Sequence, residues 1–227
     1  MSVDNYITML NNVYAYGTNN HPEHNSNPDY WGILLENVIK NTKKYKNKHA
    51  LDFGCGQGRN VSNLLKLAEW KTVDGIDISE SNINMCKKTH DPNMSNFYRN
   101  NGKDLSALST NFYDFVMSTI VLQHICVYDL RYELLKEIFR VMKIGGVFSF
   151  QMGYGDKTFV KDAQISGYYD NNHTAQHSNG SYDVRVSNEQ ELIQDLTKIG
   201  FKKITCVVKP SWADGGHSYW IYTEAVK

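Results

Sequence analysis

The fold is decided by the stretch Ala50-Leu51-Asp52-Phe53-Gly54-Cys55-Gly56-Gln57-Gly58-Arg59-Asn60. A short apolar run ends at Asp52, three glycines follow at alternate positions, and residues 60–68 have the pattern of a helix. A strand, a glycine turn and a helix in this order build a nucleotide-binding site. The glycines adopt backbone angles closed to other residues, while the helix N-terminus points unpaired N–H groups at the ligand. We expect Gly58 to open the helix and to let it pack close to the strand.

The spacing of the motif distinguishes it from the G-x-G-x-x-G loop of dinucleotide-binding proteins. Here the pattern is D-x-G-x-G-x-G, and the Asp52 carboxylate before the first glycine suits a ligand with a cationic end. This stretch resembles the first motif of the class I S-adenosylmethionine-dependent methyltransferases, of the small-molecule, type 11/12-like kind. The resemblance covers about Leu51 to Val226 and implies that Asp52 serves the amine of the methionine moiety, often through water. It also implies that S-adenosylmethionine, or the product S-adenosylhomocysteine, is bound by Gly54, Cys55, Gly56, Gly58 and Arg59.

The rest of the chain predicts alternating strands and helices. Strands are expected at Thr72–Ile78, Phe97–Arg99, Tyr113–Ser118, Val147–Phe150, Lys203–Val208 and Tyr219–Ala225. Helices are expected after Ser79, at Leu130–Met142 before the glycines 145–146, and at Glu191–Ile199 between a Ser187 cap and Gly200. No helix separates the last two strands, which indicates an antiparallel pair. The prediction is a doubly wound α/β fold with a seven-stranded, mostly parallel sheet and an antiparallel last strand.

Two segments lie outside this pattern. Residues 1–49 are expected to form a helical N-terminal cap, with a loop at 13–29 and a helical period from Ile33 to Ile39. Residues 50–227 then form the methyltransferase domain, interrupted by an insertion at about 151–185. Because long segments without periodic apolar residues are often binding loops, we expect this insertion to be a lid after strand five.

Two acidic residues are candidates for the ribose contact. Asp74 lies within the second strand, whereas Asp77 and Ile78 lie at its carboxyl end, where ligands gather, so Asp77 is preferred. The resemblance implies an adenine contact just after the third strand, at Asn101 and Gly102, with Asp104 as the alternative. It also implies that the fourth strand ends at the methyl-transfer site, beside Ser118 and Thr119.

Methyl transfer needs chiefly an aligned acceptor, and a base only if the acceptor carries a proton. His124 follows the fourth strand and is the candidate base, although a histidine at a helix start often only packs. Tyr14, Trp31 and Tyr154 are candidates for the acceptor pocket, with ordinary packing as the alternative for each. The pairs His21 and His24, and His173 and His177, lie in loop-like sequence, so no metal site is predicted.

Composition excludes several functions. Lys and Arg together number 24, as do Asp and Glu, and a formal net charge of zero argues against a dedicated nucleic-acid binder. The four cysteines form no C-x-x-C pair, and the first twenty residues are polar, so a cytoplasmic location is expected, without a membrane partner.

Three interpretations remain open. The first is methyl transfer to a small metabolite or a glycan-type acceptor. The second is another enzyme on the same fold, such as an aminopropyl transferase. The third is a catalytically silent methyltransferase-like subunit, against which the intact Asp52, the glycines and Asp77 argue. The oligomeric state is not predicted.

Overall fold

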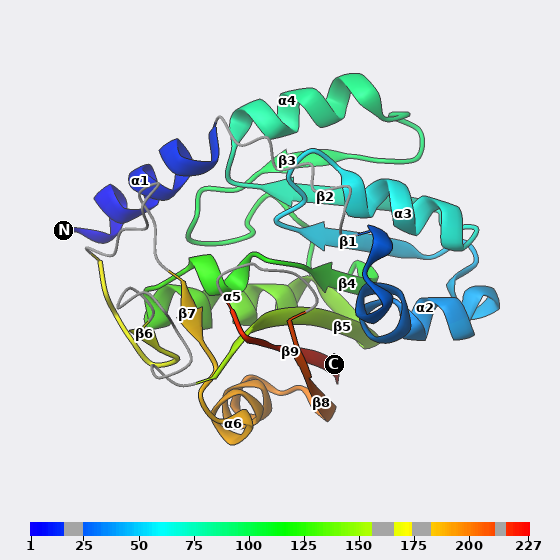
Figure 1. The fold of residues 1–227 in the computed structure, drawn as a ribbon. Helices are drawn as coiled ribbons and strands as arrows, with labels where there is room; N and C mark the ends of the chain where they lie inside the picture. The colour runs from blue at the N-terminus through cyan, green and yellow to red at the C-terminus, as the bar shows by residue number, and fades with distance from the viewer. Residues whose placement is uncertain (16–24, 156–165, 174–182, 212–216) are drawn as a thin grey trace.

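A seven-stranded sheet forms the centre of the computed structural model, which describes residues 1–15, 25–155, 166–173, 183–211 and 217–227. The strand order is β3-β2-β1-β4-β5-β9-β8, parallel from β3 to β5, with β9 antiparallel to both neighbours (Figure 1). The strands are β1 (His49–Phe53), β2 (Thr72–Asp77), β3 (Phe97–Arg99), β4 (Tyr113–Ser118), β5 (Met142–Tyr154), β8 (Lys202–Pro210) and β9 (Tyr219–Val226). The predicted fold class is confirmed.

Helices cover both faces of the sheet because successive strand residues point to opposite faces. On β1, Leu51 joins one core cluster and Ala50 the other. The Leu51 cluster takes in side chains of α1 (Val3–Ala15), α5 (Tyr128–Val141) and α6 (Glu189–Ile199). The Ala50 cluster takes in η2 (Tyr30–Leu34), α2 (Glu36–Lys40), η3 (Thr42–Tyr45), α3 (Arg59–Leu67) and α4 (Glu80–Thr89).

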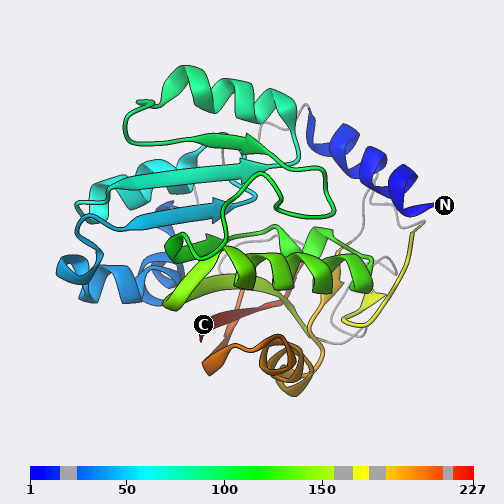
Figure 2. The same cartoon turned by 180° about the vertical axis from the view of Figure 1, so that it is seen from behind.

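The N-terminal helix and the segment after β5 lie at the same end of the sheet. Figures 1 and 2 show α1 together with β6 (Ser166–Gly167) and β7 (Val184–Arg185) at the end toward which the β1 arrow points. Asn171 forms a bridge with Val127 at the start of α5, and the Tyr128 N–H donates to the Asp170 carbonyl at 2.7 Å. Side chains from remote parts of the sequence therefore meet beyond the carboxyl ends of the parallel strands.

Several predicted boundaries need correction. The glycines 145–146 do not cap α5, because the helix ends at Val141 and Met142 is already extended and paired with Tyr113. The cap of α6 is Asn188 rather than Ser187, since the Asn188 Oδ1 accepts the Gln190 N–H at 3.0 Å.

The expected cap and insertion also differ in detail. The helical period from Ile33 to Ile39 is divided between η2 and α2, and α1 runs three residues into the expected loop. Residues 151–154 belong to β5, where they pair with β9. The predicted lid falls partly outside the described residues and stays a prediction.

Candidate functional site

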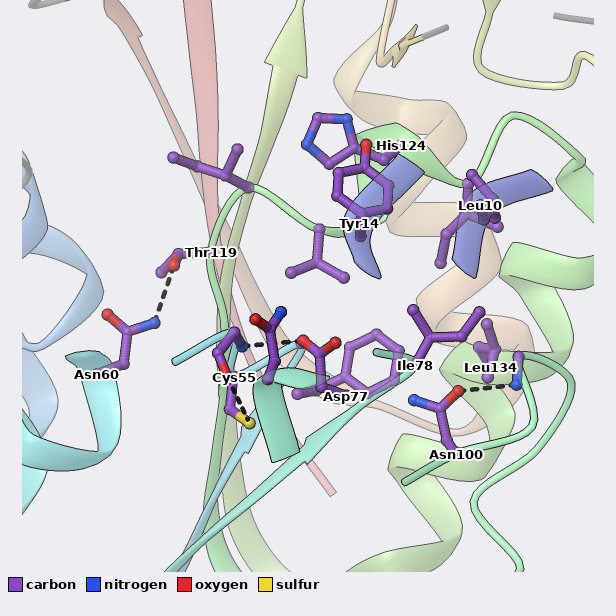
Figure 3. Close-up of a pocket in the computed structure, with 18 of the residues that line it drawn as sticks. Leu10, Tyr14, Cys55, Asn60, Asp77, Ile78, Asn100, Thr119, His124 and Leu134 are labelled. Carbon is purple, nitrogen blue, oxygen red and sulfur yellow. Dashed lines mark hydrogen bonds between the residues drawn. The ribbon is translucent and has the colours of Figure 1, made fainter. Parts of the chain in front are cut away.

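A pocket lies at the carboxyl ends of β1, β2 and β4, between the glycine turn and α1 (Figure 3). Polar residues of the turn and of β2 form one side, and apolar residues of α1 and α5 form the other, together with residues in and beside the η4 turn (Leu122–His124). Its lining comprises Leu10, Tyr14, Phe53, Gly54, Cys55, Gly56, Arg59, Asn60, Asp77, Ile78, Asn82, Asn100, Gly102, Thr119, Ile120, Val121, His124, Ile125, Leu130 and Leu134. Predicted residues in this set are Gly54, Cys55, Gly56, Arg59, Asp77, Ile78, Gly102, Thr119, His124 and Tyr14.

Glycine is required at two positions of the turn. Gly54 has φ +77°, and a Cβ there would lie 2.2 Å from the Val121 side chain. Gly58 is the N-cap of α3 with φ +84°, and a Cβ there would lie 2.5 Å from the His90 ring at the end of α4. The close approach at Gly58 is thus to α4 and not to the strand, which corrects that expectation. Gly58 shapes the turn from outside the pocket.

Asp52 is buried beneath the pocket with one carboxylate oxygen unpaired. The Asn60 Nδ2 donates to Oδ1 of Asp52 at 3.3 Å and to Oγ1 of Thr119 at 3.0 Å. Oδ2 of Asp52 has no hydrogen-bond partner among the described residues. Burial, with a smaller contribution from the charge of Asp77, raises the pKa of Asp52 to about 7, against the Asn60 hydrogen bond and the Arg59 charge. The Arg59 charge, which favours the ionised form of Asp52, does not offset the effect of burial.

Asp77 is the acidic residue that faces the pocket. Its Oδ2 accepts the Gly56 N–H and its Oδ1 accepts the Ser79 N–H, both at 2.8 Å. Burial raises the pKa of Asp77, and these backbone hydrogen bonds oppose the shift. Asp74 instead accepts hydrogen bonds from Asn96 and from the Tyr113 hydroxyl, and it does not line the pocket. The geometry therefore favours Asp77 over Asp74 for the ribose.

The polar residue after β3 that lines the pocket is Asn100, and not the neighbouring Asn101 that the resemblance suggested for the adenine contact. The Asn101 Oδ1 accepts the N–H groups of Lys103 and Asp104 at 2.8 and 2.9 Å, so this exposed side chain closes a turn. Asp104, the alternative, accepts from Ser106 and does not line the pocket either. The Asn100 Oδ1 accepts a hydrogen bond from the Gly102 N–H, and this bond fixes the orientation of the side-chain amide, including its Nδ2 donor.

Of the two predicted residues at the end of β4, Ser118 and Thr119, one lines the pocket and the other does not. Thr119 lines the pocket, whereas the Ser118 Oγ donates to the Phe53 carbonyl at 3.0 Å and ties β4 to β1. Ser118 is therefore a structural neighbour of the pocket and not part of its lining.

The three candidates for the acceptor pocket are not brought together. Tyr14 lines the pocket, and its ring centroid lies 5.3 Å from that of His124. Trp31 donates through Nε1 to the Asn25 carbonyl and packs edge-on against Tyr30, outside the pocket. Tyr154 pairs with Tyr219 at the end of β5 and likewise lies outside. The correction has a physical reason, since both outlying rings are held by neighbours in the core.

His124 has a partner that the sequence did not predict. Its Nδ1 lies 2.5 Å from Oδ1 of Asp183, which precedes β7 in the insertion. The two residues are 59 positions apart, and no periodicity around Asp183 signals the contact. Asn60, Asn82 and Asn100 were also missed, because the helix-start and turn positions they occupy are common for Asn in any protein.

Possible metal ligands are described only in part. His21, His24 and His177 lie outside the described residues, and the His173 ring packs edge-on against Tyr6 at 6.1 Å. Within the described ranges, no group of three or more His, Cys, Asp or Glu side chains has a geometry that would hold a metal ion. The described helices likewise include none that is both long and apolar enough to span a membrane.

Curated relatives match less than half of the chain. A fatty-acid O-methyltransferase of Mycolicibacterium smegmatis is 31% identical over 101 residues, which are 44% of this chain and 35% of the relative. A phthiotriol/phenolphthiotriol dimycocerosates methyltransferase of Mycobacterium tuberculosis is 29% identical over 103 residues, 45% of this chain and 37% of the relative. The matches span little more than a third of the length of these relatives.

Solved structures match over most of the chain. The 1,6-didemethyltoxoflavin-N1-methyltransferase of Burkholderia thailandensis, solved with 1,6-didemethyltoxoflavin and S-adenosylhomocysteine, has a TM-score of 0.68 at 15% identity, covering 100% of this chain and 91% of that one. An S-adenosylmethionine-dependent methyltransferase of Mesorhizobium loti has a TM-score of 0.64 at 15% identity, covering 89% and 99%. At such identities the likeness shows the fold.

Motif, fold and matches agree on one class. Residues 51–150 match the family described as methyltransferase domain. The fold is that of solved S-adenosylmethionine-dependent methyltransferases, in agreement with the resemblance found in the sequence.

Proposed function

We propose that the protein transfers a methyl group from S-adenosylmethionine to a small-molecule acceptor in the pocket at the carboxyl ends of β1, β2 and β4. The observation that carries the proposal is the unpaired oxygen of the buried Asp52. Burying a carboxylate oxygen without a hydrogen-bond partner destabilises the folded protein. An ammonium group beside it supplies both a hydrogen bond and a compensating charge. The amine of the methionine moiety is such a group, as the sequence motif predicted.

The remaining lining accounts for the rest of the donor. Asn60 and Thr119 lie at one side of the pocket, Asp77 lies at its centre, and Ile78 and Asn100 lie on the other side (Figure 3). The methionine end is assigned to the Asn60 side and the ribose hydroxyls to the Asp77 carboxylate. Adenine then lies against the apolar Ile78, with Asn100 able to hydrogen-bond its edge.

The chemistry requires alignment more than activation by the protein. S-adenosylmethionine supplies a methyl group that is already activated on a sulfonium. Residues of this chain hold the acceptor in line with it, and alignment of two reactants contributes roughly 7–11 kcal/mol in favourable cases. His124 is assigned as the base that takes the acceptor's proton, since it lines the pocket beside Tyr14.

The acceptor is assigned from the residues around His124. Tyr14, Val121 and Ile125 present aromatic and apolar surfaces to the pocket. Such a lining suits a metabolite with a flat or apolar body better than a glycan-type acceptor, whose hydroxyl groups need several polar partners. The zero net charge likewise favours a small molecule over a nucleic acid as partner.

Calorimetry with S-adenosylhomocysteine tests the proposal. We expect one-site binding in the micromolar range or tighter, about −8 kcal/mol or better. NADH is the matched control, since it shares the adenosine and lacks the cationic end, and it is expected to give no heat. Absence of S-adenosylhomocysteine binding by a folded sample would refute the proposal, as would equal binding of the two ligands.

A further inference from the structure

We propose that Asp183, His217 and Arg185 form a buried hydrogen-bonded chain that fixes His124 in one tautomer, with Nδ1 protonated and Nε2 available as the base. The inference rests on the proposed function, because it concerns the same pocket. It assigns a positioning role to three residues that come from β7, its N-terminal approach and the approach to β9.

The chain of contacts runs from the pocket into the core. The Asp183 carboxylate is shared by two imidazoles, with Oδ1 at 2.5 Å from the His124 Nδ1 and Oδ2 at 2.9 Å from the His217 Nε2. The Arg185 Nε donates to the His217 Nδ1 at 3.2 Å. Side-chain exposure falls along the series, from 22% at His124 to 10% at Asp183 and 1% at His217.

The position of each proton follows from the last member of the chain. A guanidinium has only donors, so the His217 Nδ1 must accept and the ring must carry its proton on Nε2. Nε2 therefore donates to Asp183. An ionised carboxylate has only acceptors, so the His124 Nδ1 must also donate to it. A neutral His124 then has its lone pair on Nε2, the nitrogen that Asp183 does not hold.

The surroundings keep His217 neutral and in place. Burial lowers the pKa of His217, the neighbouring charges of Arg185 and His124 act in the same direction, and the Asp183 hydrogen bond and charge oppose them. On β5, a Cβ at Gly153 would lie 2.1 Å from the His217 Nδ1. The imidazole thus occupies space that the absence of a side chain at Gly153 leaves open. Because the His217 ring is packed this closely, its hydrogen bond holds the Asp183 carboxylate in a fixed position.

The arrangement indicates what kind of acceptor needs it. The step balances when an electron pair of the acceptor heteroatom forms the bond to the methyl carbon, the carbon–sulfur bond breaks with its electrons going to sulfur, and the acceptor's proton moves to the His124 Nε2. A carboxylate is already ionised at neutral pH and gains nothing from a base. The hydrogen-bonded arrangement around His124 therefore favours an acceptor with a neutral O–H or N–H group. In this respect we expect it to differ from the relative named for a fatty acid.

Other titratable groups face His124 from the elements packed around it. The Tyr14 ring approaches from α1, and the Tyr6 hydroxyl, also on α1, donates to the His124 carbonyl at 3.2 Å. Cys126 follows in the chain, and its N–H donates to the Tyr6 oxygen at 2.6 Å. Burial raises the pKa values of the Tyr6 and Cys126 side chains, so both stay neutral near pH 7. Among the residues that the structure describes, Asp183 is thus the charged group in direct contact with the imidazole.

Nitrogen NMR of histidine-labelled protein tests the inference without a known acceptor. The chain has eight histidines, and the variants His124→Gln and His217→Gln assign the two signals of interest. At neutral pH we expect wild-type His124 to be protonated on Nδ1 and His217 on Nε2, with a strongly downfield proton from the short bond to Asp183. A wild-type His124 protonated on Nε2, or a mixture of tautomers, overturns the inference. The tautomer is read from the wild-type spectrum, and the two variants serve only to assign its signals.

Variants separate positioning from mere packing. Asp183→Asn should abolish the single tautomer of His124 and the downfield proton, whereas Asp129→Asn, which removes an exposed carboxylate at the start of α5, should change neither. Gly153→Ala keeps every titratable group and should disturb the His217 signal first. An unchanged His124 tautomer in a folded Asp183→Asn sample contradicts the inference.

Two outcomes distinguish this inference from the proposed function. Wild-type protein that fails to bind S-adenosylhomocysteine refutes the proposed function. Wild-type protein that binds it but shows the wrong His124 tautomer refutes only the inference. Methyl transfer to a long-chain fatty acid, at a rate that His124→Gln leaves unchanged, would also overturn the assignment of His124 as a base.

Discussion

The Asn60 Nδ2 donates to Oδ1 of Asp52 at 3.3 Å and leaves Oδ2 of that buried carboxylate without a partner among the described residues. The two residues stand on either side of the glycine turn, one at the end of β1 and the other in the first turn of α3. A buried carboxylate oxygen without a partner can accept a hydrogen bond from a cationic ligand. Its protonation should therefore be linked to binding of the donor.

We expect Asp52 to make affinity for the cofactor depend on pH. Its pKa is raised to about 7 by burial, so it is largely protonated in mild acid. An ammonium group beside the carboxylate lowers that pKa, and binding below the free value must therefore release a proton. Affinity for S-adenosylhomocysteine should rise with pH up to about 7, by up to tenfold per unit.

Calorimetry from about pH 5.5 to 7.5 measures this dependence. The pKa of the other buried acid, Asp77, is also raised, so the variant Asp52→Asn is needed to separate the effect of Asp52 from that of Asp77. The variant should bind more weakly and show a flatter profile. An affinity that stays constant over this range, or the same slope in Asp52→Asn, would contradict the role given to Asp52.

Asp77 and Asp74 form a matched pair for the ribose contact. Both are buried in β2, but Asp77 alone of the two lines the pocket. Asp77→Asn should weaken S-adenosylhomocysteine binding at least tenfold, since a hydrogen bond to a charged group is worth roughly 1.5–3 kcal/mol. Asp74→Asn should lower thermal stability through its contacts to Asn96 and Tyr113 but leave affinity within a few-fold. The reverse order of affinities would show that the assignment is wrong.

The sheet was predictable from the sequence because each strand has a local signal. Phe97–Arg99 and Tyr113–Ser118 have the bounds expected from apolar runs between turn residues. The failure at the end of α5 is instructive. Gly145 and Gly146 resemble a helix stop, yet Met142 already pairs with Tyr113, and such a contact across the sheet is not visible in local sequence.

The site was predictable only where a motif defines it. The glycine turn and Asp77 follow from spacing, and Gly54, Gly56 and Asp77 line the pocket as expected. Asn100 was missed by one residue, since nothing in the sequence shows which of two adjacent asparagines closes a turn. Asp183 was missed because its partner lies 59 positions away and neither residue belongs to a periodic segment.

Tyr14 and Trp31 test which aromatic residues serve the acceptor. Tyr14 lies beside His124 in the pocket lining, while Trp31 packs against Tyr30 outside it. Tyr14→Ala should leave S-adenosylhomocysteine affinity within a few-fold and reduce methyl transfer once an acceptor is identified. Trp31→Ala should lower thermal stability without a specific effect on transfer. If the two variants affect transfer equally at matched stability, Tyr14 has no special part in acceptor binding.

A crystal structure with S-adenosylhomocysteine tests the central claim most directly. The account predicts the amine at Oδ2 of Asp52, the ribose hydroxyls at the Asp77 carboxylate, and the sulfur facing Tyr14 and His124. Bound acceptor would then lie between the sulfur and the His124 Nε2. A ligand whose sulfur faces away from His124, or whose amine lies far from Asp52, would contradict the account.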